Sequence, residues 1–268
     1  MLIHCTSYIK SKMLIAAVYC TMNNADIAQE TIRIFANADD GQKAKVARDT
    51  TFYTGGTVPH ITRNYATVIS VERGDTLAVT RKYLDERPCV LNMASKYQPG
   101  GGWLRGATAQ EEQLSYRSGL YQSLSHFSHQ YPLAAYDALY SKDVRVIRDD
   151  NMKLLAPDEQ YDVSFVSMAA ICRPLLIENR LCPPDVKRTA EKMRIILRVA
   201  YINGHSTLIL GAFGCGAYGN PPEQIAALFR DVLAEPEFRD VFKRVVFAIL
   251  DSFQSDNYNV FYRTFSRN

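Results

Sequence analysis

The sequence has little net charge and no long apolar run. Its 31 basic residues nearly balance its 28 acidic residues, so the formal net charge at pH 7 is +3. So small an excess does not favour nucleic-acid binding through charge alone. No segment approaches the roughly 20 consecutive apolar residues that a membrane-spanning helix requires. We therefore expect no membrane partner and no direct need for nucleic acid, whereas a phosphate-bearing small ligand needs only a local anion site.

The cysteines lack the paired spacing of zinc sites and redox motifs. No CxxC occurs, and several cysteines lie inside apolar runs, far from one another in the sequence. This pattern favours free thiols in a reducing compartment, and we expect a cytoplasmic protein, with the nucleus as an alternative. The six cysteines are Cys5, Cys20, Cys89, Cys172, Cys182 and Cys215.

The chain also lacks internal repeats, low-complexity tracts and linkers. Its 268 residues are 47% hydrophobic, which is ample for one folded core. Residues 13–20 are apolar and follow two lysines, but the segment is short and has no clear small-residue cleavage site. We therefore treat residues 1–22 as an uncertain N-terminal segment and predict a single domain over residues 23–268.

Strand patterns alternate with helical patterns along this domain. Residues 37–64 are polar and glycine-rich and predict a long loop. Capping residues precede the first two helices, at 23–26 and at Asp75. Alternation with crossover-length helices favours an α/β sheet covered on both faces. The predicted strands are 66–71, 89–93, 144–148, 163–168, 207–210 and 245–250, and the predicted helices are 27–36, 76–84, 113–124, 184–203 and one opened by Pro221 and Pro222.

The most informative stretch is residues 90–112, where an apolar strand leads into three consecutive glycines. Glycines cost backbone entropy, so a run of three is best explained where the chain passes against a ligand or adopts positive φ. Gln110, Glu111 and Glu112 follow after seven intervening residues and open a helix. Acidic residues in a first helical turn also complement the helix dipole, which by itself would explain them. The glycines ahead of them favour a site.

A second glycine-rich loop follows the strand at 207–210. The segment 208–222 runs from a buried strand through a loop with four glycines into a helix that begins with proline. Successive backbone N–H groups with a helix N-terminus behind them bind phosphate without a basic side chain. No Gly-Lys-Ser/Thr follows the glycines, so the loop is not a Walker A motif, and the segment lacks the combination of GxGxxG with a ribose-binding acid that marks a Rossmann unit. Taken alone, it fits a phosphate loop and an ordinary tight turn equally well.

The GGG, seven residues and QEE resemble the signature of the microbial-type poly(ADP-ribose) glycohydrolases, which have the macrodomain fold. The resemblance covers about residues 24–266, and the loop after 210 is similar to the family's diphosphate-binding loop. It implies a macrodomain-like three-layer α/β/α sandwich with a mixed central sheet. It also implies a monomeric hydrolase that releases ADP-ribose from poly(ADP-ribosyl)ated proteins, without a cofactor or metal ion.

The resemblance further implies roles for individual residues. Glu112 would protonate the departing oxygen and then activate water, while Glu111 would hold ribose hydroxyls. Repulsion between two carboxylates in a partly desolvated cleft would raise the pKa of one of them. The substrate-binding residues implied are Asn92, Gly100, Gly101, Gly102, Gln110, Gly214, Cys215, Gly216, Ala217 and Tyr218.

Other interpretations stay open at this point. Where relatives often carry a proline closely followed by an asparagine, this chain has Ala169-Ala-Ile-Cys-Arg173. A hydrolase of mono-ADP-ribosyl groups on protein, for example on arginine, is therefore an alternative, as is a non-catalytic ADP-ribose-binding macrodomain. A dinucleotide-dependent oxidoreductase fits less well. Tyr97 and Trp103 flank the glycines and either pack the loop or stack on the ligand, while His126 and His129 fit the surface better than a metal site.

Overall fold

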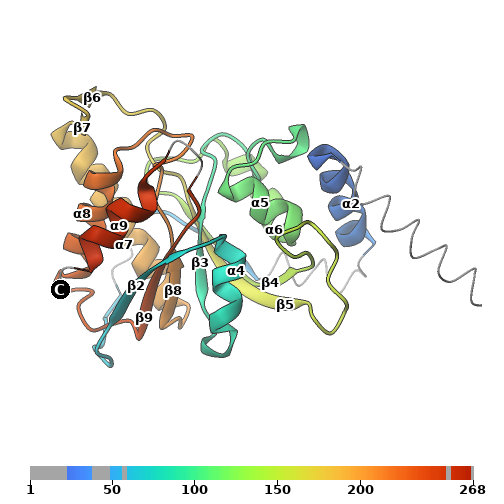
Figure 1. The fold of residues 1–268 in the computed structure, drawn as a ribbon, viewed down its shortest axis with the longest axis horizontal. Coiled ribbons are helices and arrows are strands. Elements are labelled where there is room, and N and C mark those ends of the chain that lie inside the picture. Colours follow the sequence, from blue (N-terminus) through green and yellow to red (C-terminus); the bar gives the residue numbers. More distant parts are fainter. Residues whose placement is uncertain (1–22, 38–48, 56–58, 252–254, 267–268) are drawn as a thin grey trace, which may run out of the picture.

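The computed structural model describes residues 23–37, 49–55, 59–251 and 255–266 (Figure 1). The predicted N-terminal segment 1–22 lies outside the described residues. Four of the six cysteines fall within them, and all four are free thiols: Cys89, Cys172, Cys182 and Cys215. Within the same residues, no helix is both long enough and apolar enough to cross a membrane.

A seven-stranded mixed sheet, ordered β1-β4-β5-β3-β8-β9-β2, forms the centre of the molecule. Strands β5, β3, β8, β9 and β2 are mutually parallel, while β4 runs antiparallel to both β1 and β5. The mixed sheet predicted from the family resemblance is confirmed. The strands are β1 (Thr50–Tyr53), β2 (Val68–Arg73), β3 (Cys89–Met93), β4 (Ala138–Val146), β5 (Tyr161–Met168), β8 (Thr207–Leu210) and β9 (Arg244–Ile249).

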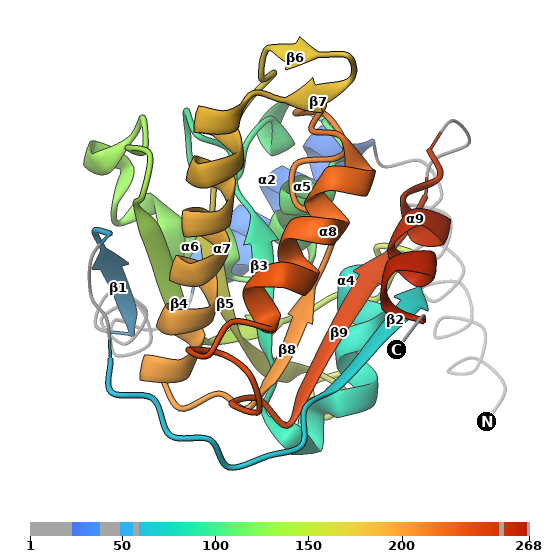
Figure 2. The ribbon, with the colours of Figure 1, turned by 90° about the vertical axis from the view of Figure 1, so that its left-hand side faces the viewer.

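Helices cover both faces of this sheet, as Figures 1 and 2 show together. One face carries α7 (Pro183–Ile202), α8 (Pro222–Leu233) and α9 (Asn257–Phe265). The other carries α4 (Thr76–Thr80), α5 (Gln110–Arg117) and α6 (Leu120–Ser125), and α2 (Asn24–Ala36) packs outside α5. This arrangement is the three-layer α/β/α sandwich that the sequence predicted.

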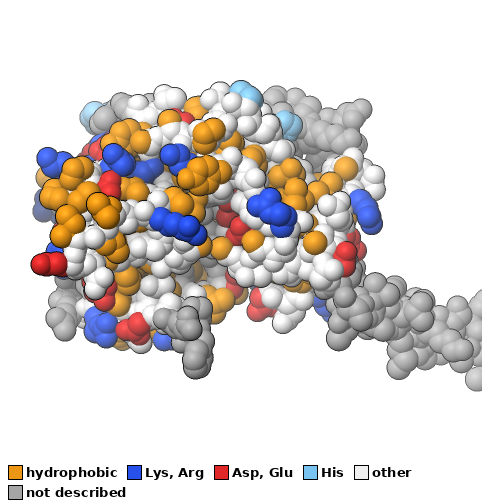
Figure 3. Space-filling view, turned by 90° about the horizontal axis from the view of Figure 1, so that it is seen from above, with side chains coloured by type: hydrophobic (Ala, Val, Ile, Leu, Met, Phe, Trp, Pro, Cys, Tyr) orange, Lys and Arg blue, Asp and Glu red, His pale blue; other side chains and the backbone are white. Residues whose placement is uncertain are grey.

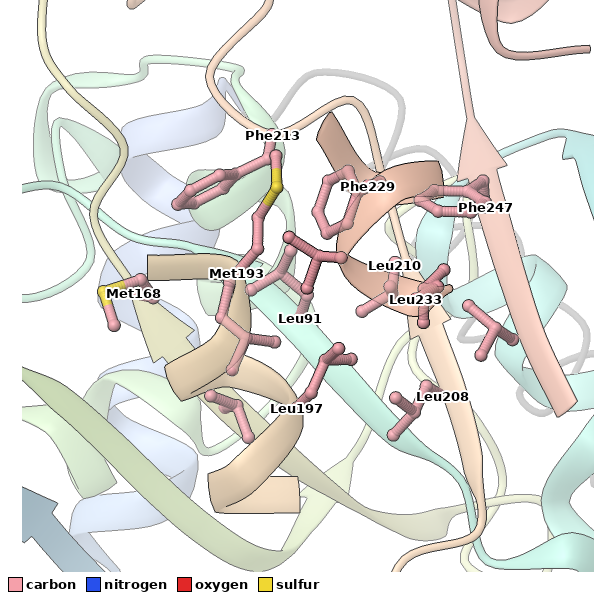
Figure 4. Packing of buried hydrophobic residues seen from close by; sticks show 14 of the residues in the cluster. Leu91, Met168, Met193, Leu197, Leu208, Leu210, Phe213, Phe229, Leu233 and Phe247 are labelled. Carbon is pink, nitrogen blue, oxygen red and sulfur yellow. The ribbon is translucent and has the colours of Figure 1, made fainter. Parts of the chain in front are cut away.

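The two hydrophobic cores follow from the two-residue period of the strands. In β3, Leu91 faces the core beneath α7 and α8, whereas Val90 faces the core beneath α4 and α5. In β8, Leu208 and Leu210 face the first core and Ile209 the second. Figure 4 shows the first core, where leucines of the strands meet α7 and α8. Continuous apolar runs in both strands are therefore required, because each is buried on both sides.

The bounds of β3 and β8 agree with the predicted strands, and α2 begins with a capping box at Asn23. The loop predicted over 37–64 is wrong in part, because Thr50–Tyr53 forms the edge strand β1, paired with β4. The single helix predicted at 113–124 is also wrong. The observed helix α5 begins at Gln110 and ends before Ser118, whose backbone is extended and pairs with Val146. Helix α6 follows after this break.

Some elements were not predicted at all. Helix α9 is one, and it packs Val260 and Phe261 into the first core. The other is a small hairpin of β6 (Leu176–Ile177) and β7 (Arg180–Leu181), which projects beyond α7 and α8 in Figure 2. Of the helix predicted over 76–84, only Thr76–Thr80 is α-helical, and a 3₁₀ helix follows over Arg81–Glu86.

A buried ion pair ties α2 to the rest of the domain. The side chain of Arg148 is fully buried, and its guanidinium donates to Glu30 Oε2 at 2.5 Å and to the carbonyl of Met152 at 3.0 Å. Glu30→Gln should lower the free energy of unfolding by up to about 3 kcal/mol, because it leaves a buried charge without its counter-ion. Urea unfolding measures this value. Asp231→Asn, which removes one partner of an exposed pair, is the control, and equal effects in both variants would contradict the argument.

Candidate functional site

A cleft of about 380 Å³ opens at the carboxyl ends of the parallel strands β3 and β8. The chain leaves β3 toward α5 on one face of the sheet and leaves β8 toward α8 on the other. Such a switch point is where α/β sheets bind ligands. In Figure 3, which looks onto this end of the sheet, acidic side chains lie near the middle of the face with Lys and Arg side chains on both sides.

The structure brings the two glycine-rich segments together in this cleft. Three of the residues assigned from the sequence do not line it: Asn92 is fully buried beneath, Gly100 is buried behind Trp103, and Cys215 is half-buried outside it. The assigned residues that line the cleft are Gly101, Gly102, Gln110, Glu111, Glu112, Gly214, Gly216, Ala217 and Tyr218.

Gln110 fixes the start of α5 against the end of β3. Its Nε2 donates to the carbonyl of Leu91 at 2.7 Å, and its Oε1 accepts from the N–H of Met93 at 2.9 Å. Both polar atoms of the amide are thus bonded to the main chain of one strand. Gln110, which the family resemblance assigned to substrate binding, lines the cleft, and its bonds hold the start of α5 at the end of β3.

Glu111 is held at both carboxylate oxygens. Oε1 accepts from Asn92 Nδ2 at 3.3 Å, and Oε2 accepts from the N–H of Ser95 at 2.6 Å. Asn92 also donates to Ser167 Oγ at 3.0 Å. The side chain of Glu111 is only 3% exposed, so its orientation is determined by β3, by the segment after it, and by β5.

Glu112 is held at one oxygen only. Oε1 accepts from the N–H of Gly102 at 2.8 Å. Oε2 is buried and has no hydrogen-bond partner among the described residues. Buried polar atoms are seldom left unpaired, and an unpaired one in a cleft marks a place for a ligand or water. The two neighbouring glutamates therefore differ in their surroundings, with Glu112 the less constrained.

Gly101 allows both carboxylates to approach the loop. Its φ of +58° lies in the left-handed region, and a Cβ at this position would lie 2.4 Å from Glu112 Oε1 and 3.1 Å from Glu111 Oε2. Only glycine meets both conditions. A valine at position 101 would therefore displace the Glu112 carboxylate.

Burial raises the pKa of Glu111 to about 8. The hydrogen bonds from Ser95 and Asn92 oppose this rise, and the nearby Glu112 carboxylate adds to it. The sequence predicted that repulsion within the pair would raise one pKa. The structure shows such a rise at Glu111, with desolvation as the larger cause, so the site holds a proton near neutral pH.

The loop after β8 forms the opposite wall of the cleft. Gly214 has a φ of +76°, and its carbonyl accepts from the N–H of Asn220 at 3.0 Å, which closes the loop. Helix α8 begins directly behind it, and its N-terminus has no side-chain cap. The hydroxyl of Tyr218 accepts from the N–H of Lys96 at 2.8 Å and so joins this wall to the segment after β3. The arrangement suits an anion at the helix N-terminus.

Tyr97 and Trp103, whose roles the sequence left open, have different surroundings in the structure. Trp103 is fully buried against Tyr116 and Tyr121 and packs the glycine loop down. Tyr97 is 62% exposed and lines the cleft. The sequence analysis missed several lining residues, although their position next to the two motifs was a usable signal: Met93, Ala94, Ser95, Gln98, Arg105, Ala109, Ala170 and Ala212.

His126 and His129 are exposed, as expected from the lack of a carboxylate or third ligand near them in the sequence. Neither lines the cleft. Among the residues whose positions are described, no group of three or more His, Cys, Asp or Glu side chains is arranged to hold a metal ion.

Fold and cleft together define a macrodomain-like α/β protein with a carboxylate pair facing a glycine-rich anion loop. Residues 28–149 match the family described as microbial-type PARG, catalytic domain. The chain is 31% identical to poly(ADP-ribose) glycohydrolase from Thermomonospora curvata, with a TM-score of 0.79 over 90% of this chain and 99% of that one. It belongs to the family of microbial-type poly(ADP-ribose) glycohydrolases.

Two further solved structures carry ligands. The Thermomonospora curvata enzyme bound to the inhibitor ADP-HPD is 31% identical, with a TM-score of 0.77 over 90% of this chain and 98% of that chain. Poly(ADP-ribose) glycohydrolase from Deinococcus radiodurans in complex with ADP-ribose is 28% identical, with a TM-score of 0.71 over 85% of this chain and 99% of that one. Among curated proteins, no match was found.

Glu111→Gln should flatten the dependence of stability on pH. The native state binds the Glu111 proton more tightly than the unfolded chain, whose carboxyl has an ordinary pKa of 4.5. The contribution of this group is therefore present at low pH and is lost as the pH rises from 4.5 to about 8, by at most about 1.4 kcal/mol per pH unit.

Urea unfolding across this pH range measures the effect. Glu178→Gln, an exposed change in the β6–β7 turn, is the matched control and should keep the wild-type pH dependence. A Glu111→Gln protein that loses stability with pH as steeply as the wild type would contradict the argument from burial.

Proposed function

We propose that this protein hydrolyses the ribose–ribose glycosidic bond of poly(ADP-ribose) and releases ADP-ribose. The observation that carries the proposal is the asymmetric pair at the start of α5, where Glu111 is held at both oxygens and Glu112 at one. Glycoside hydrolysis needs an acid for the departing oxygen and stabilisation of an oxocarbenium-like ribose. The family membership of the chain supports the same activity.

The loop Gly214–Tyr218 after β8, here called the anion loop, positions the ADP-ribose unit. Backbone N–H groups of the cleft-lining residues Gly214, Gly216, Ala217 and Tyr218 and the uncapped N-terminus of α8 bind the diphosphate, and no cation from the protein is needed for this. The distal ribose then lies between this loop and the carboxylate pair. Because the loop and the pair belong to rigid elements joined by the bond from Lys96 to Tyr218, binding energy from the diphosphate positions the ribose for reaction.

The two glutamates then divide the chemistry. Ribose hydroxyls donate to Glu111 and stabilise its carboxylate form, so that the proton held in the site becomes available at Glu112. Glu112 protonates the departing oxygen and, as a carboxylate, activates the attacking water. Asn92 and Ser95 keep Glu111 in place throughout, which is a positioning role rather than a catalytic one.

The segment Ala169–Arg173 forms the outer wall, where this chain departs from the pattern of its relatives. Ala170 lines the cleft, and the N–H of Arg173 donates to the carbonyl of Tyr218 at 2.9 Å. The wall is therefore attached to the anion loop but presents small side chains. A protein-linked mono-ADP-ribosyl group is the alternative substrate, and we test it beside the polymer.

A reducing, cytoplasmic location and a monomeric state accompany this proposal. The four free cysteines of the described residues support the first, since burial raises the pKa of Cys89 and Cys215 and leaves those thiols unreactive. The partner in this proposal is ADP-ribosylated protein.

Glu112→Gln should separate binding from chemistry. Glutamine keeps size and hydrogen bonding but cannot exchange a proton, so turnover should fall by the ~10²–10⁴ typical of lost general acid–base catalysis while ADP-ribose affinity changes little. Glu111→Gln should impair turnover less, unless the ribose shifts by about 1 Å, which can itself cost ~10²-fold. Released ADP-ribose is measured from automodified poly(ADP-ribosyl)ated protein and from mono-ADP-ribosylated protein.

The outcomes discriminate among the functions. Cleavage of the mono-linked group alone would favour the alternative substrate, and a wild-type protein that binds ADP-ribose but cleaves neither would favour a non-catalytic binder. Wild-type rates for Glu112→Gln would show that the acid is misassigned.

Gly216→Val should weaken ADP-ribose binding without loss of fold. A Cβ at Gly216 meets no protein atom within 4 Å, and the residue lines the cleft, so the valine occupies ligand space only. We expect a loss of at least tenfold in affinity by calorimetry, or about 1.4 kcal/mol. Ala234→Val, at the other end of α8, is the control. Unchanged affinity in a folded Gly216→Val protein would remove the loop from the binding site.

A further inference from the structure

Arg105 places an unpaired positive charge on the cleft wall beside the proposed acid. It ends the 3₁₀ turn Trp103–Arg105, is exposed and lines the cleft. Its Nη2 lies 4.0 Å from the point where a Cβ of Gly102 would stand, and Glu112 Oε1 lies 3.7 Å from the same point. Within the described part of the chain, its side chain forms no hydrogen bond or ion pair.

Tyr97 supplies an exposed aromatic ring to the same cleft. It stands at the other end of the segment that holds the three glycines, and 62% of its surface is exposed. Its ring stacks on no other aromatic ring among the described residues, in contrast to Trp103. A large aromatic side chain left exposed at a cleft, with a free guanidinium nearby, is suited to a base and a phosphate.

The departing group of poly(ADP-ribose) has this chemistry. Its oxygen belongs to a ribose that carries adenine directly and a diphosphate at its 5′ end. The released ADP-ribose unit is held by the loop Gly214–Tyr218, so the departing unit lies on the side of Glu112 that faces the glycine segment. Resting on the proposed function, we propose that Arg105 and Tyr97 form the subsite for this departing nucleotide, with Arg105 contacting phosphate and Tyr97 stacking on the base.

Such a subsite determines specificity rather than chemistry. A departing group that is a nucleotide gains a charge-assisted contact and a stacked ring, whereas a small departing group gains neither. The contacts of Arg105 and Tyr97 with the departing nucleotide change kcat/KM for the polymer. They do not change the affinity for the released ADP-ribose, because that unit is held by the loop after β8. The subsite thus favours the polymer over other ADP-ribosyl substrates.

Two substrates test this inference in the full-length protein. One is poly(ADP-ribose), and the other is ADP-ribose linked to 4-nitrophenol, whose departing group has neither base nor phosphate. Arg105→Ala should lower kcat/KM on the polymer by about 10- to 100-fold, the range for a hydrogen bond to a charged group, with a much smaller loss on the aryl substrate. Arg105→Lys should recover part of the loss, and the salt dependence of kcat/KM on the polymer should weaken in Arg105→Ala.

Tyr97 gives an independent measurement. Tyr97→Ala should lower kcat/KM on the polymer by about tenfold, and Tyr97→Phe, which keeps the ring, should restore most of it. Arg81→Ala, an exposed arginine that does not line the cleft, removes the same charge and should leave both rates unchanged.

Equal losses on both substrates in Arg105→Ala would overturn the inference, because the guanidinium would then act through Glu112. Rates on the polymer within about twofold of wild type in both Arg105→Ala and Tyr97→Ala would overturn it as well. A wild-type protein that cleaves neither substrate would overturn the proposed function and this inference with it.

Discussion

The site depends first on the attachment of α5 to the end of β3 through one side chain. Gln110 bonds to the carbonyl of Leu91 and to the N–H of Met93, so the first turn of the helix cannot rotate relative to the strand. Helix α5 starts without a side-chain cap at Ala109, and the bonds of Gln110 attach its first turn to β3. The two residues after Gln110 are the glutamates, and their positions in the cleft follow from its bonds.

Two glutamates with the same chemistry then acquire different properties from their neighbours. Glu111 accepts hydrogen bonds from Asn92 and Ser95. Its burial raises its pKa to about 8 against the opposing effect of these bonds. Glu112 is bonded only to Gly102 and keeps one oxygen unpaired. The two carboxylates thus have different hydrogen-bond environments, and Gly101 makes this arrangement possible because a Cβ there would lie 2.4 Å from Glu112 Oε1 and 3.1 Å from Glu111 Oε2.

Much of this was accessible from the sequence. The strands β3 and β8 were predicted within their observed bounds because a strand buried on both faces reads as an uninterrupted apolar run ending at a loop. The glycines and the glutamate pair were recognised as a site from their order alone. Elements that depend on distant partners were missed. Strand β1 exists because β4 offers an edge, and the break between α5 and α6 exists because Ser118 pairs with Val146.

The roles of single residues were the least predictable, for a physical reason. Asn92 and Gln110 belong to the motif, yet their amides are bonded to protein groups, which only the packed structure reveals. Arg105 lies between the glycines and Gln110, and Tyr97 lies just before the glycines. Nothing in the sequence distinguishes either of them from an ordinary surface residue. Exposure and the lack of a partner are properties of a folded arrangement and not of a pattern.

The cleft can be understood as three regions with different physical tasks. The loop after β8 leads into the uncapped N-terminus of α8, an arrangement that suits an anion. Both glutamates of the pair are buried, and burial raises the pKa of Glu111. The third region, formed by Arg105 and Tyr97, is exposed to solvent. Its contacts depend on the chemical groups that the substrate carries there. The first two regions are the ones that the hydrogen bonds of Gln110 and Tyr218 hold in place.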